Sequence, residues 1–454
     1  MKKVSPRTLS GFMELLPDDQ LVMNEMLERL QRSYELFGFS PLDTPIIEAA
    51  EVLLAKAGGE TEKQIYTMQK GESELALRFD LTVPLAKFVA ANYGALSFPF
   101  RRYQIGKVYR GERAQRGRFR EFYQADVDII GDGELGLIYE AEIAAVIYKT
   151  ITSLGLDEFK IKLNNRKILN GFFEYIGERE NSLFILQTID KLDKIGLKAV
   201  INILSDKGIK RESIDETLKF LGVSGSNSEI LEKLEQYKDK NETLSTGVEE
   251  LKEVTESIKD FLVPEDKVLI DLSIARGLDY YTGTVYETFL DKHPEIGSIC
   301  SGGRYDNLAE FYSKKSLPGV GVSIGVTRLF YVLDEQGLLN KDCFSSADVL
   351  IIPLVEDLKG PIGIASKLRG RGIKTELYTE KRKLKAKLSY ADKIRVPFVI
   401  LLGEDEISSN KLTLKDMKSG EQRGVSLEEA AELILKRKAQ TADIRLIAEK
   451  KEEE

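Results

Sequence analysis

Cysteine, histidine and long apolar runs are all scarce in this sequence, and each shortage excludes a class of protein. The two cysteines, Cys300 and Cys343, cannot supply a disulfide framework or a cysteine-based zinc site. The single histidine, His293, precedes Pro294 in a turn-like stretch and is expected at the surface, which excludes catalysis by a histidine base. No apolar run reaches the roughly 18 residues of a membrane span, and MKKVSPRTLSGF lacks the apolar stretch of a signal peptide. We therefore expect a cytoplasmic protein with no membrane partner.

The overall composition is that of a soluble protein with several domains. A chain of 454 residues has room for two to four domains with real cores. Its hydrophobic share of 42% and charged share of 31% are ordinary. Because the net charge is −8, any contact with nucleic acid must come from local basic patches.

One segment, Tyr109–Gly131, concentrates unusual chemistry. From Arg101 to Arg120 there are eight arginines or lysines and one acid, Glu112. Strand-like residues precede and follow a glycine-containing turn at 111–117, which predicts a long hairpin. The arginines on or beside its strands are rigidly supported and suited to grip phosphate oxygens in pairs.

The period of two along the second strand of this hairpin predicts a polar face. That face would carry Arg118, Arg120, Phe122, Gln124, Asp126 and Asp128. Cation, ring, amide and carboxylate in a row suit a ligand with a phosphate, a flat base and a polar end.

Upstream, two further segments have local interpretations that leave their function open. Helical spacing after Asp18 or Asp19 predicts a helix that ends at Gly38, followed by an extended strand over 41–47 with Pro45 inside it. A strand containing proline belongs at a sheet edge or an interface. Farther on, Asp80 and Thr82 lie between a strand and a helix, where Asp80 could simply cap the helix.

The second half of the chain alternates helical and strand-like parts. Residues 165–263 read as a helical insertion, for which a spacer role is the simplest account. Residues 274–288, IARGLDYYTGTVYET, combine a cation, glycines and paired tyrosines in a strand-turn-strand. Residues 319–329 read as a glycine-rich strand followed by a helix that carries Arg328, without the spacing of a dinucleotide-binding motif.

The C-terminal part reads as a separate domain. After a linker at 340–346, a βαβ pattern over 347–437 predicts a small α/β domain. Five cations fall within Lys381–Lys387, beside its second strand. Residues 438–454 form a charged tail, of which Ala448–Glu454, AEKKEEE, is nearly all charge and is expected to fray.

Together these segments resemble the class II aminoacyl-tRNA synthetases. The segment around Pro45 is similar to their first motif, YRGE around Arg110 to the second, and residues 319–329 to the third. RGRFREFYQADVDIIG, ARGLDYY and SICSGGRYDNL resemble the histidyl-tRNA synthetases in particular. The resemblance implies an α+β fold, in which helices flank a class II antiparallel sheet. It also implies a catalytic domain over 1–337 with the helical insertion at about 165–263, an α/β anticodon-binding domain over 347–437, and the tail over 438–454.

The resemblance also implies the reaction and its partners. Histidine would be activated with ATP to histidyl-adenylate and transferred to the 3′ end of tRNA(His), with Mg²⁺ as cofactor, by a homodimer. The implied residues are Arg276 and Arg110 for catalysis; Asp80, Thr82, Gln124, Asp128, Tyr280 and Tyr281 for histidine; Arg110, Glu112, Arg118, Phe122 and Arg328 for ATP; and Arg113, Gln115, Arg116, Lys381, Arg382 and Lys383 for tRNA. No metal site built from protein ligands is expected.

This chemistry needs no general base, because the attacking carboxylate is already ionised near pH 7. The site must instead supply positioning and positive charge to the phosphates. We expect Arg110 and Arg276 at the α-phosphate, and Arg118 and Arg328 at the γ-phosphate. Mg²⁺ would be held mainly by phosphate and water, with Glu112 nearby.

Two other functions are weighed against this one. The synthetase-like regulatory subunit of ATP phosphoribosyltransferase, a histidine sensor, lacks the C-terminal domain and has usually lost catalytic residues. Here Arg110, Glu112, Arg276 and Arg328 are all present, and so is the domain over 347–437. A general RNA-binding module would explain the basic patches but not the ordered motifs.

Overall fold

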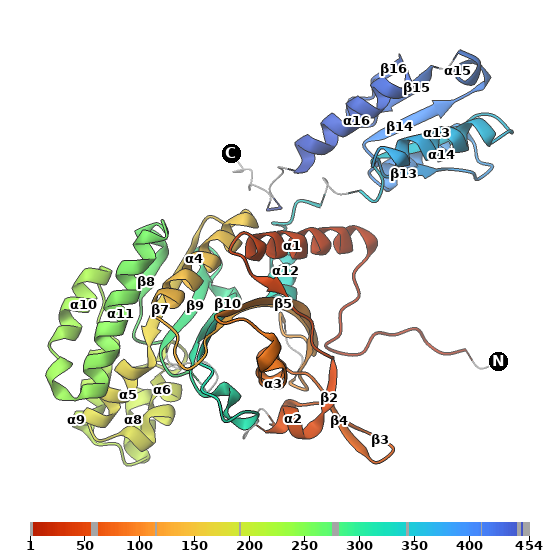
Figure 1. Cartoon of the computed structure of the whole chain (residues 1–454). Coiled ribbons are helices and arrows are strands. Elements are labelled where there is room, and N and C mark those ends of the chain that lie inside the picture. Colours follow the sequence, from red (N-terminus) through yellow and green to blue (C-terminus); the bar gives the residue numbers. More distant parts are fainter. Residues whose placement is uncertain are drawn as a thin grey trace. The chain divides into compact units, whose positions relative to one another are not determined.

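The computed structural model describes residues 3–55, 62–113, 116–189, 192–274, 281–341, 345–409, 411–442 and 446–447. The chain divides into two compact units, shown in Figure 1. One comprises residues 1–14 and 27–336, and the other residues 15–26 and 337–454. Within the described residues, no helix combines the length and apolar character needed to cross a membrane.

The first unit is organised around a mixed sheet that is mainly antiparallel. Among the described residues it has eight strands, in the order β1-β5-β6-β11-β10-β9-β7-β8, and the pairs β1–β5 and β7–β8 are parallel. The strands are β1 (Ser40–Pro41), β5 (Phe100–Tyr109), β6 (Glu121–Ile130), β7 (Phe159–Asn165), β8 (Val268–Ile270), β9 (Thr284–Leu290), β10 (Cys300–Tyr305) and β11 (Gly319–Gly325). The expected α+β fold with a large antiparallel sheet is confirmed.

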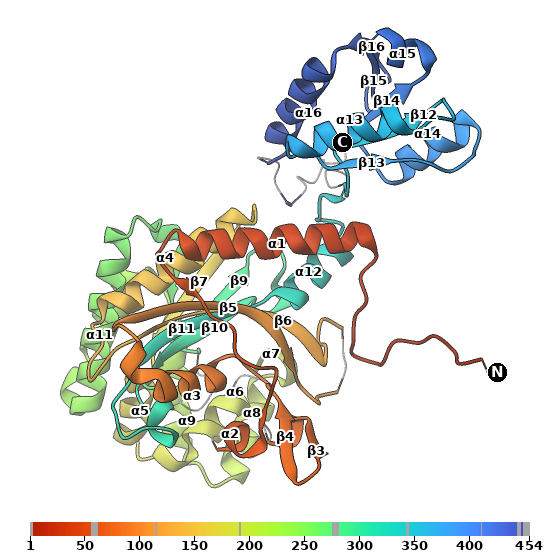
Figure 2. The same cartoon turned by 45° about the vertical axis from the view of Figure 1, so that its right-hand side comes forward.

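Strands β5 and β6 form the predicted long hairpin and continue into β11. Phe100 pairs with Ile130 and Tyr109 with Glu121, so ten residues of each strand are in register. Val127 and Ile129 are fully buried, and a slip by one residue would exchange their places with those of Asp126 and Asp128, so the apolar face fixes the register. Figure 2 shows β5 and β6 running beside each other through the sheet.

Helices and a small second sheet complete this part of the unit. The helices are α1 (Pro17–Glu35), of which residues 27–35 belong to this unit, α2 (Ala50–Leu54), α3 (Thr82–Asn92), α4 (Ile138–Ser153) and α12 (Val326–Glu335), and the small sheet has β2 (Ile47–Ala49), β3 (Thr67–Lys70) and β4 (Ser73–Leu77). Helix α1 is longer at its start than predicted, so Asp18 and Asp19 lie in its first turn and do not cap it. Gly38, at φ +74°, ends the turn that follows the helix, as expected.

The predicted strand over residues 41–47 is wrong. β1 ends at Pro41, β2 begins at Ile47, and Pro45 lies in the connection between them. Proline has no N–H to donate, so it interrupts a ladder instead of lying within one. The edge placement itself is confirmed for β1, whose one partner in the sheet order is β5.

Residues 166–260 form the predicted helical insertion. Its helices are α5 (Arg166–Tyr175), α6 (Ser182–Ile189), α7 (Leu192–Ile195), α8 (Leu197–Asp206), α9 (Arg211–Leu221), α10 (Asn227–Glu235) and α11 (Glu242–Asp260). Figure 1 shows them gathered beside β7 and β8. Two glycines allow α5 and α11 to approach closely, because a Cβ on Gly171 would lie 2.5 Å from the Leu244 backbone and one on Gly247 2.7 Å from the Ile168 backbone.

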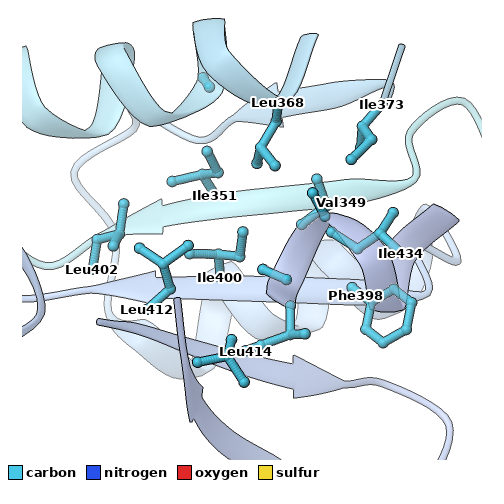
Figure 3. Packing of buried hydrophobic residues seen from close by; sticks show 14 residues of the cluster. Val349, Ile351, Leu368, Ile373, Phe398, Ile400, Leu402, Leu412, Leu414 and Ile434 are labelled. Atoms are coloured by element: carbon cyan, nitrogen blue, oxygen red, sulfur yellow. The ribbon is translucent and has the colours of Figure 1, made fainter. Parts of the chain in front are cut away.

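The C-terminal unit contains the predicted βαβ arrangement. Its described elements are β12 (Val349–Pro353), α13 (Lys359–Gly370), β13 (Thr375–Leu377), α14 (Leu384–Lys393), β14 (Phe398–Leu402), α15 (Glu404–Ser409), β15 (Leu412–Asp416), β16 (Gln422–Val425) and α16 (Leu427–Ala442). β12 is parallel to both β13 and β14, as the pattern indicated, and β15 and β16 extend the sheet in antiparallel fashion. Figure 3 shows one core of this unit, where Leu368 of α13 and Ile434 of α16 pack on β12 and β14.

Candidate active site

A cavity of about 450 Å³ opens on the face of the large sheet formed by β6, β10 and β11. Side chains from seven places along the chain converge on it. Its described lining residues are Asp80, Thr82, Arg110, Glu112, Gly117, Arg118, Phe119, Phe122, Gln124, Asp126, Tyr281, Ser298, Ile299, Cys300, Ser301, Ser323, Gly325 and Arg328. A second cavity of about 20 Å³ shares Thr82, Asp126, Tyr281 and Ser323 with the first and adds Asp128, Tyr305, Gly321 and Val322.

Strand β6 presents the predicted polar face to these cavities, with one exception. Phe122, Gln124 and Asp126 line the large cavity, and Asp128 lines the small one. Arg120 does not share this face, because β6 begins only at Glu121 and the alternation does not extend to it. Its Nε donates to the carbonyl of Glu112 at 3.0 Å, and its side chain packs where a Cβ on Gly11 would lie.

Three guanidinium groups line the large cavity, and one of them lies over an aromatic ring. Arg110 donates through Nε to the carbonyl of Phe79 at 2.9 Å, and its guanidinium carbon lies 5.2 Å from the centre of the Phe122 ring. Arg118 lies 3.6 Å from the Glu112 carboxylate. Arg328 donates to the carbonyl of Ile296, and burial together with the charge of Arg118 lowers its pKa. Cations that are fixed by carbonyls and repel one another are suited to an anion with several charges.

The same cavity is lined by oxygen atoms that need donors. Within the described part of the chain, Asp80 Oδ2, Gln124 Oε1 and Asp126 Oδ1 are buried without a hydrogen-bond partner. The opposite atoms are engaged for Asp80, whose Oδ1 accepts from the N–H of Val83 at 3.1 Å, and for Gln124, whose Nε2 donates to Ser323 Oγ at 2.7 Å. Buried polar atoms left unpaired are costly, so these three oxygens indicate a ligand that brings donors.

Burial also changes the charge of these acids. It raises the pKa of Asp80 to about 6 and that of Asp126 to about 7, with Arg110 and Arg102, respectively, acting against the shift. Asp128 differs because both of its oxygens have partners. Arg102 lies 2.7 Å from Oδ2, and the Tyr305 hydroxyl donates to Oδ1 at 2.7 Å. Burial still raises the pKa of Asp128.

The structure brings most of the predicted histidine and ATP residues together. Asp80, Thr82, Gln124 and Tyr281 line the large cavity with Arg110, Glu112, Arg118, Phe122 and Arg328, and Asp128 lines the small one. Arg276, Tyr280 and Gln115 lie outside the described residues. The local interpretation of Asp80 as a helix cap is also correct in part, because Asp80 bonds the first turn of α3 while lining the cavity.

The predicted tRNA residues lie elsewhere. Arg113 and Arg116 are exposed, and Arg116 pairs with Glu335 at 2.7 Å. In the C-terminal unit, Lys381, Arg382 and Lys383 are exposed just before α14.

Two site residues had no assigned role in the sequence analysis. Asp126 was placed on the correct face of β6 but given no ligand contact, although it lines both cavities. Ser323 pairs with Asp126 across β6 and β11. The alternation of side chains along β6 indicated that Asp126 faces the site. Ser323 could be identified only once the pairing of β11 with β6 was known.

Comparison with known proteins agrees with this geometry. Residues 11–329 match a family model described as histidyl-tRNA synthetase, and residues 348–437 match one described as an anticodon binding domain. The histidine–tRNA ligase of Clostridium tetani is 52% identical over 437 residues, covering 96% of this chain and 99% of the relative. That of Finegoldia magna is 48% identical over 429 residues, covering 94% and 99%.

Solved structures add the fold. The crystal structure of histidyl-tRNA synthetase from Nostoc sp. PCC 7120 is 37% identical with a TM-score of 0.87, covering 96% of this chain and 100% of that one. A protein from Bacillus halodurans described as an ATP phosphoribosyltransferase regulatory subunit/histidyl-tRNA synthetase has a TM-score of 0.73 at 20% identity, covering 88% of this chain and 99% of that one. That second likeness shows the fold alone, whereas the full-length identities near 50% show the family. The chain belongs to the histidyl-tRNA synthetases, and its catalytic unit has the class II synthetase fold.

Proposed function

We propose that this chain activates histidine with ATP and transfers the histidyl group to the 3′ end of tRNA(His). The observation that carries the proposal is that one cavity combines two kinds of groups. Three guanidinium groups line it with Phe122, and so do three buried oxygens that have no hydrogen-bond partner among the described residues. A phosphate-bearing nucleotide suits the guanidinium groups, and an amino acid with several N–H donors suits the oxygens.

Histidine supplies the donors that these oxygens lack. Its α-ammonium has three N–H groups and its neutral imidazole has one, whereas Asp80 Oδ2, Gln124 Oε1 and Asp126 Oδ1 all accept. A side chain without the imidazole N–H would leave a buried acceptor unpaired, which is the strongest form of discrimination available to a polar pocket. We assign the ammonium to Asp80, Thr82 and Gln124, and the imidazole to Asp126 and Tyr281.

ATP would lie in the same cavity with its adenine against Phe122. Arg110 meets the α-phosphate, and Arg118 and Arg328 meet the γ-phosphate. A carboxylate oxygen of histidine attacks the α-phosphorus while the bond to the bridging oxygen breaks, and pyrophosphate leaves with the electron pair. A ribose hydroxyl at the 3′ end of tRNA then attacks the acyl carbonyl, and AMP leaves. The chain contributes positioning and charge to both steps.

The carboxylate of Glu112 lies in the cavity near Arg118, where it fits as an oxygen ligand to a cation carried by the phosphates. Mg²⁺ bound there would neutralise charge on the β- and γ-phosphates. A sensor that binds only histidine does not need this arrangement of Arg110, Arg118, Arg328 and Glu112. The regulatory-subunit alternative is therefore not favoured.

The direct test is histidine-dependent exchange of pyrophosphate into ATP, followed by charging of tRNA(His). We expect exchange with purified protein, ATP, Mg²⁺ and histidine in the absence of tRNA. We expect charging when tRNA(His) is added. Histidine binding without either activity would favour the sensor.

The exposed cations before α14 provide a test of tRNA binding. Replacing Lys381, Arg382 and Lys383 together by glutamate should lower kcat/KM for tRNA about tenfold, because phosphate contacts would become repulsive. Pyrophosphate exchange should not change. A matched control replaces Lys359 and Lys367 by glutamate, since these exposed lysines lie on α13, which packs on the opposite face of the sheet from α14. Equal charging by both variants would refute a tRNA contact at 381–383.

We also propose a homodimer that covers the region around Pro45. Leu36, Ile46 and Ile47 are large apolar residues with exposed fractions of 72%, 42% and 48%, and they flank the sheet-edge strand β1. Exposed apolar groups beside an open edge favour a covered surface.

Replacing Ile46 and Ile47 together by glutamate should convert the dimer to a monomer at micromolar concentration, as measured by light scattering. Leu183, exposed to 51% on α6 of the insertion, gives the control, and Leu183→Glu should remain dimeric. A wild-type protein that is already monomeric would contradict the proposal.

A further inference from the structure

Behind the site, a group of ion pairs joins α4 to the end of β10. Arg304 Nη1 donates to Glu140 Oε1 at 2.8 Å and to the carbonyl of Leu135 at 2.9 Å. Arg304 Nε donates to Asp306 Oδ1 at 2.9 Å. The Glu140 side chain is fully buried, and that of Arg304 is 15% exposed. Neither Arg304 nor Asp306 is among the described residues that line the cavities, so this group does not touch the substrate positions proposed above.

The group instead holds the backbone that follows Tyr281. The Thr282 hydroxyl donates to Asp306 Oδ2 at 2.5 Å, and the Thr282 N–H donates to the carbonyl of Arg304 at 2.8 Å. Gly283 lies directly on the arginine, because a Cβ there would be 2.8 Å from Arg304 Cδ. Thr282 is therefore attached by both its side chain and its backbone.

Tyr281 directly precedes Thr282 in the chain and lines both cavities. Its ring lies close to β10, since a Cβ on Gly303 would come within 2.9 Å of Tyr281 Cδ1. The position of the Tyr281 ring thus depends on the absence of a side chain at Gly303 and on the hydrogen bonds that hold Thr282 to Arg304 and Asp306. In the same strand, Tyr305 holds Asp128 through its hydroxyl. Gly303 and Tyr305 of β10 therefore contact residues that line the cavities, Tyr281 and Asp128. Arg304, which lies between them in the strand, forms the ion pairs with Glu140 and Asp306.

We infer that Arg304 and Asp306 are positioning residues for histidine, acting through Thr282 on Tyr281. The inference rests on the histidine site proposed above. A buried ion pair is a poor device for stability alone, since apolar residues of similar volume often serve as well. It does, however, fix direction, because the fork of Arg304 must meet Glu140 and Asp306 together. The fixed fork presents Asp306 to Thr282 in one orientation.

Thr282→Val tests the link with the least disturbance, because it removes a hydroxyl and leaves every charge in place. The measured quantities are KM for histidine, KM for ATP and kcat in pyrophosphate exchange. We expect KM for histidine to rise about tenfold, as for the loss of one hydrogen bond to a charged group, with KM for ATP and kcat changed less than about twofold. The matched control is Thr217→Val in the insertion, which removes a buried hydroxyl bonded to the Ser213 carbonyl at 2.7 Å and should leave all three constants unchanged.

A double-mutant cycle identifies Tyr281 as the intermediary. In a Tyr281→Ala background, Thr282→Val should raise KM for histidine no further, because the ring that it positions is gone. Additive effects would overturn the route through Tyr281, and an unchanged KM for histidine in Thr282→Val alone would overturn the inference as a whole. Both readings require that the wild-type protein exchanges pyrophosphate. Its failure to do so would refute the proposed function, and the inference with it.

Discussion

Replacing Arg110 by alanine should slow histidyl-adenylate formation by about 10²–10³-fold, the usual loss for one preorganised donor to developing charge. Arg110 is held from one side by the Phe79 carbonyl and lies over the Phe122 ring, so its remaining N–H groups are directed by the protein before ATP arrives. The loss should appear mainly in kcat of pyrophosphate exchange. Arg110→Lys should recover only part of it, because an ammonium cannot make two parallel bonds to a phosphate.

The control for Arg110, which directly follows β5, is an arginine at the other end of that strand. Arg101 is the second residue of β5 and forms two bonds to Glu142, at 2.6 and 2.9 Å. Arg101→Ala removes this salt bridge but should leave the exchange rate unchanged. Melting temperatures of both variants show whether the protein is folded. Near-normal exchange by a folded Arg110→Ala protein would refute the α-phosphate assignment.

Sequence reasoning was most successful where the pattern and the chemistry lie in the same strand. The β5–β6 hairpin follows from alternating residues on both sides of a glycine turn, and its period of two correctly aligned Phe122, Gln124, Asp126 and Asp128. The same period wrongly placed Arg120 on this face, because side chains alternate between faces only within the strand and β6 begins at Glu121. Pro45 shows the same limit, since a break in pairing is decided by hydrogen bonds across the sheet.

The remaining part of the site depends on contacts between distant segments. No local pattern indicates that Arg102 and Tyr305 occupy both oxygens of Asp128, or that Asp126 keeps one oxygen free. Asp80 illustrates a related difficulty, because one carboxylate both caps α3 and faces the cavity. The residues of the site could therefore be predicted from the sequence. Which of their oxygen atoms are bonded within the protein and which face the cavity could not.

Asp126→Asn should raise KM for histidine about 10- to 100-fold, as expected for loss of a charged acceptor to a buried N–H group. The same change should raise the melting temperature of the ligand-free protein at pH 8. Burial raises the pKa of Asp126 from its usual 3.8 to about 7, so the folded state holds this proton more tightly than the unfolded chain does. Its contribution to stability is thus fully present below about pH 4 and is lost as the pH rises to about 7. Asparagine does not ionise, so it avoids this loss.

The pH profile gives the second measurement for Asp126. In the wild-type protein, kcat/KM for histidine should fall as the pH drops below about 7, because the protonated carboxyl no longer attracts the ligand's N–H group. In Asp126→Asn, kcat/KM for histidine should not show this fall below pH 7, and at pH 8 it should be lower than in the wild-type protein. Asp132→Asn is the matched control, because Asp132 follows the same strand but lines neither cavity. Its Oδ2 accepts a hydrogen bond from the Tyr93 hydroxyl at 2.5 Å.

Asp128→Asn separates the two carboxylates by the sign of the stability change. Both oxygens of Asp128 face donors, Arg102 and the Tyr305 hydroxyl, so asparagine would turn its NH₂ group toward one of them and should lower the melting temperature at pH 8. Asp126 Oδ1 has no hydrogen-bond partner among the described residues, so Asp126→Asn removes a poorly compensated buried anion and should raise the melting temperature. If Asp128→Asn loses histidine binding while Asp126→Asn binds normally, the imidazole contact belongs to Asp128, as the family resemblance implied. If both variants lose histidine binding but only Asp128→Asn is destabilised, Asp126 makes the imidazole contact. Asp128 then acts indirectly, by holding Arg102 and Tyr305 in place.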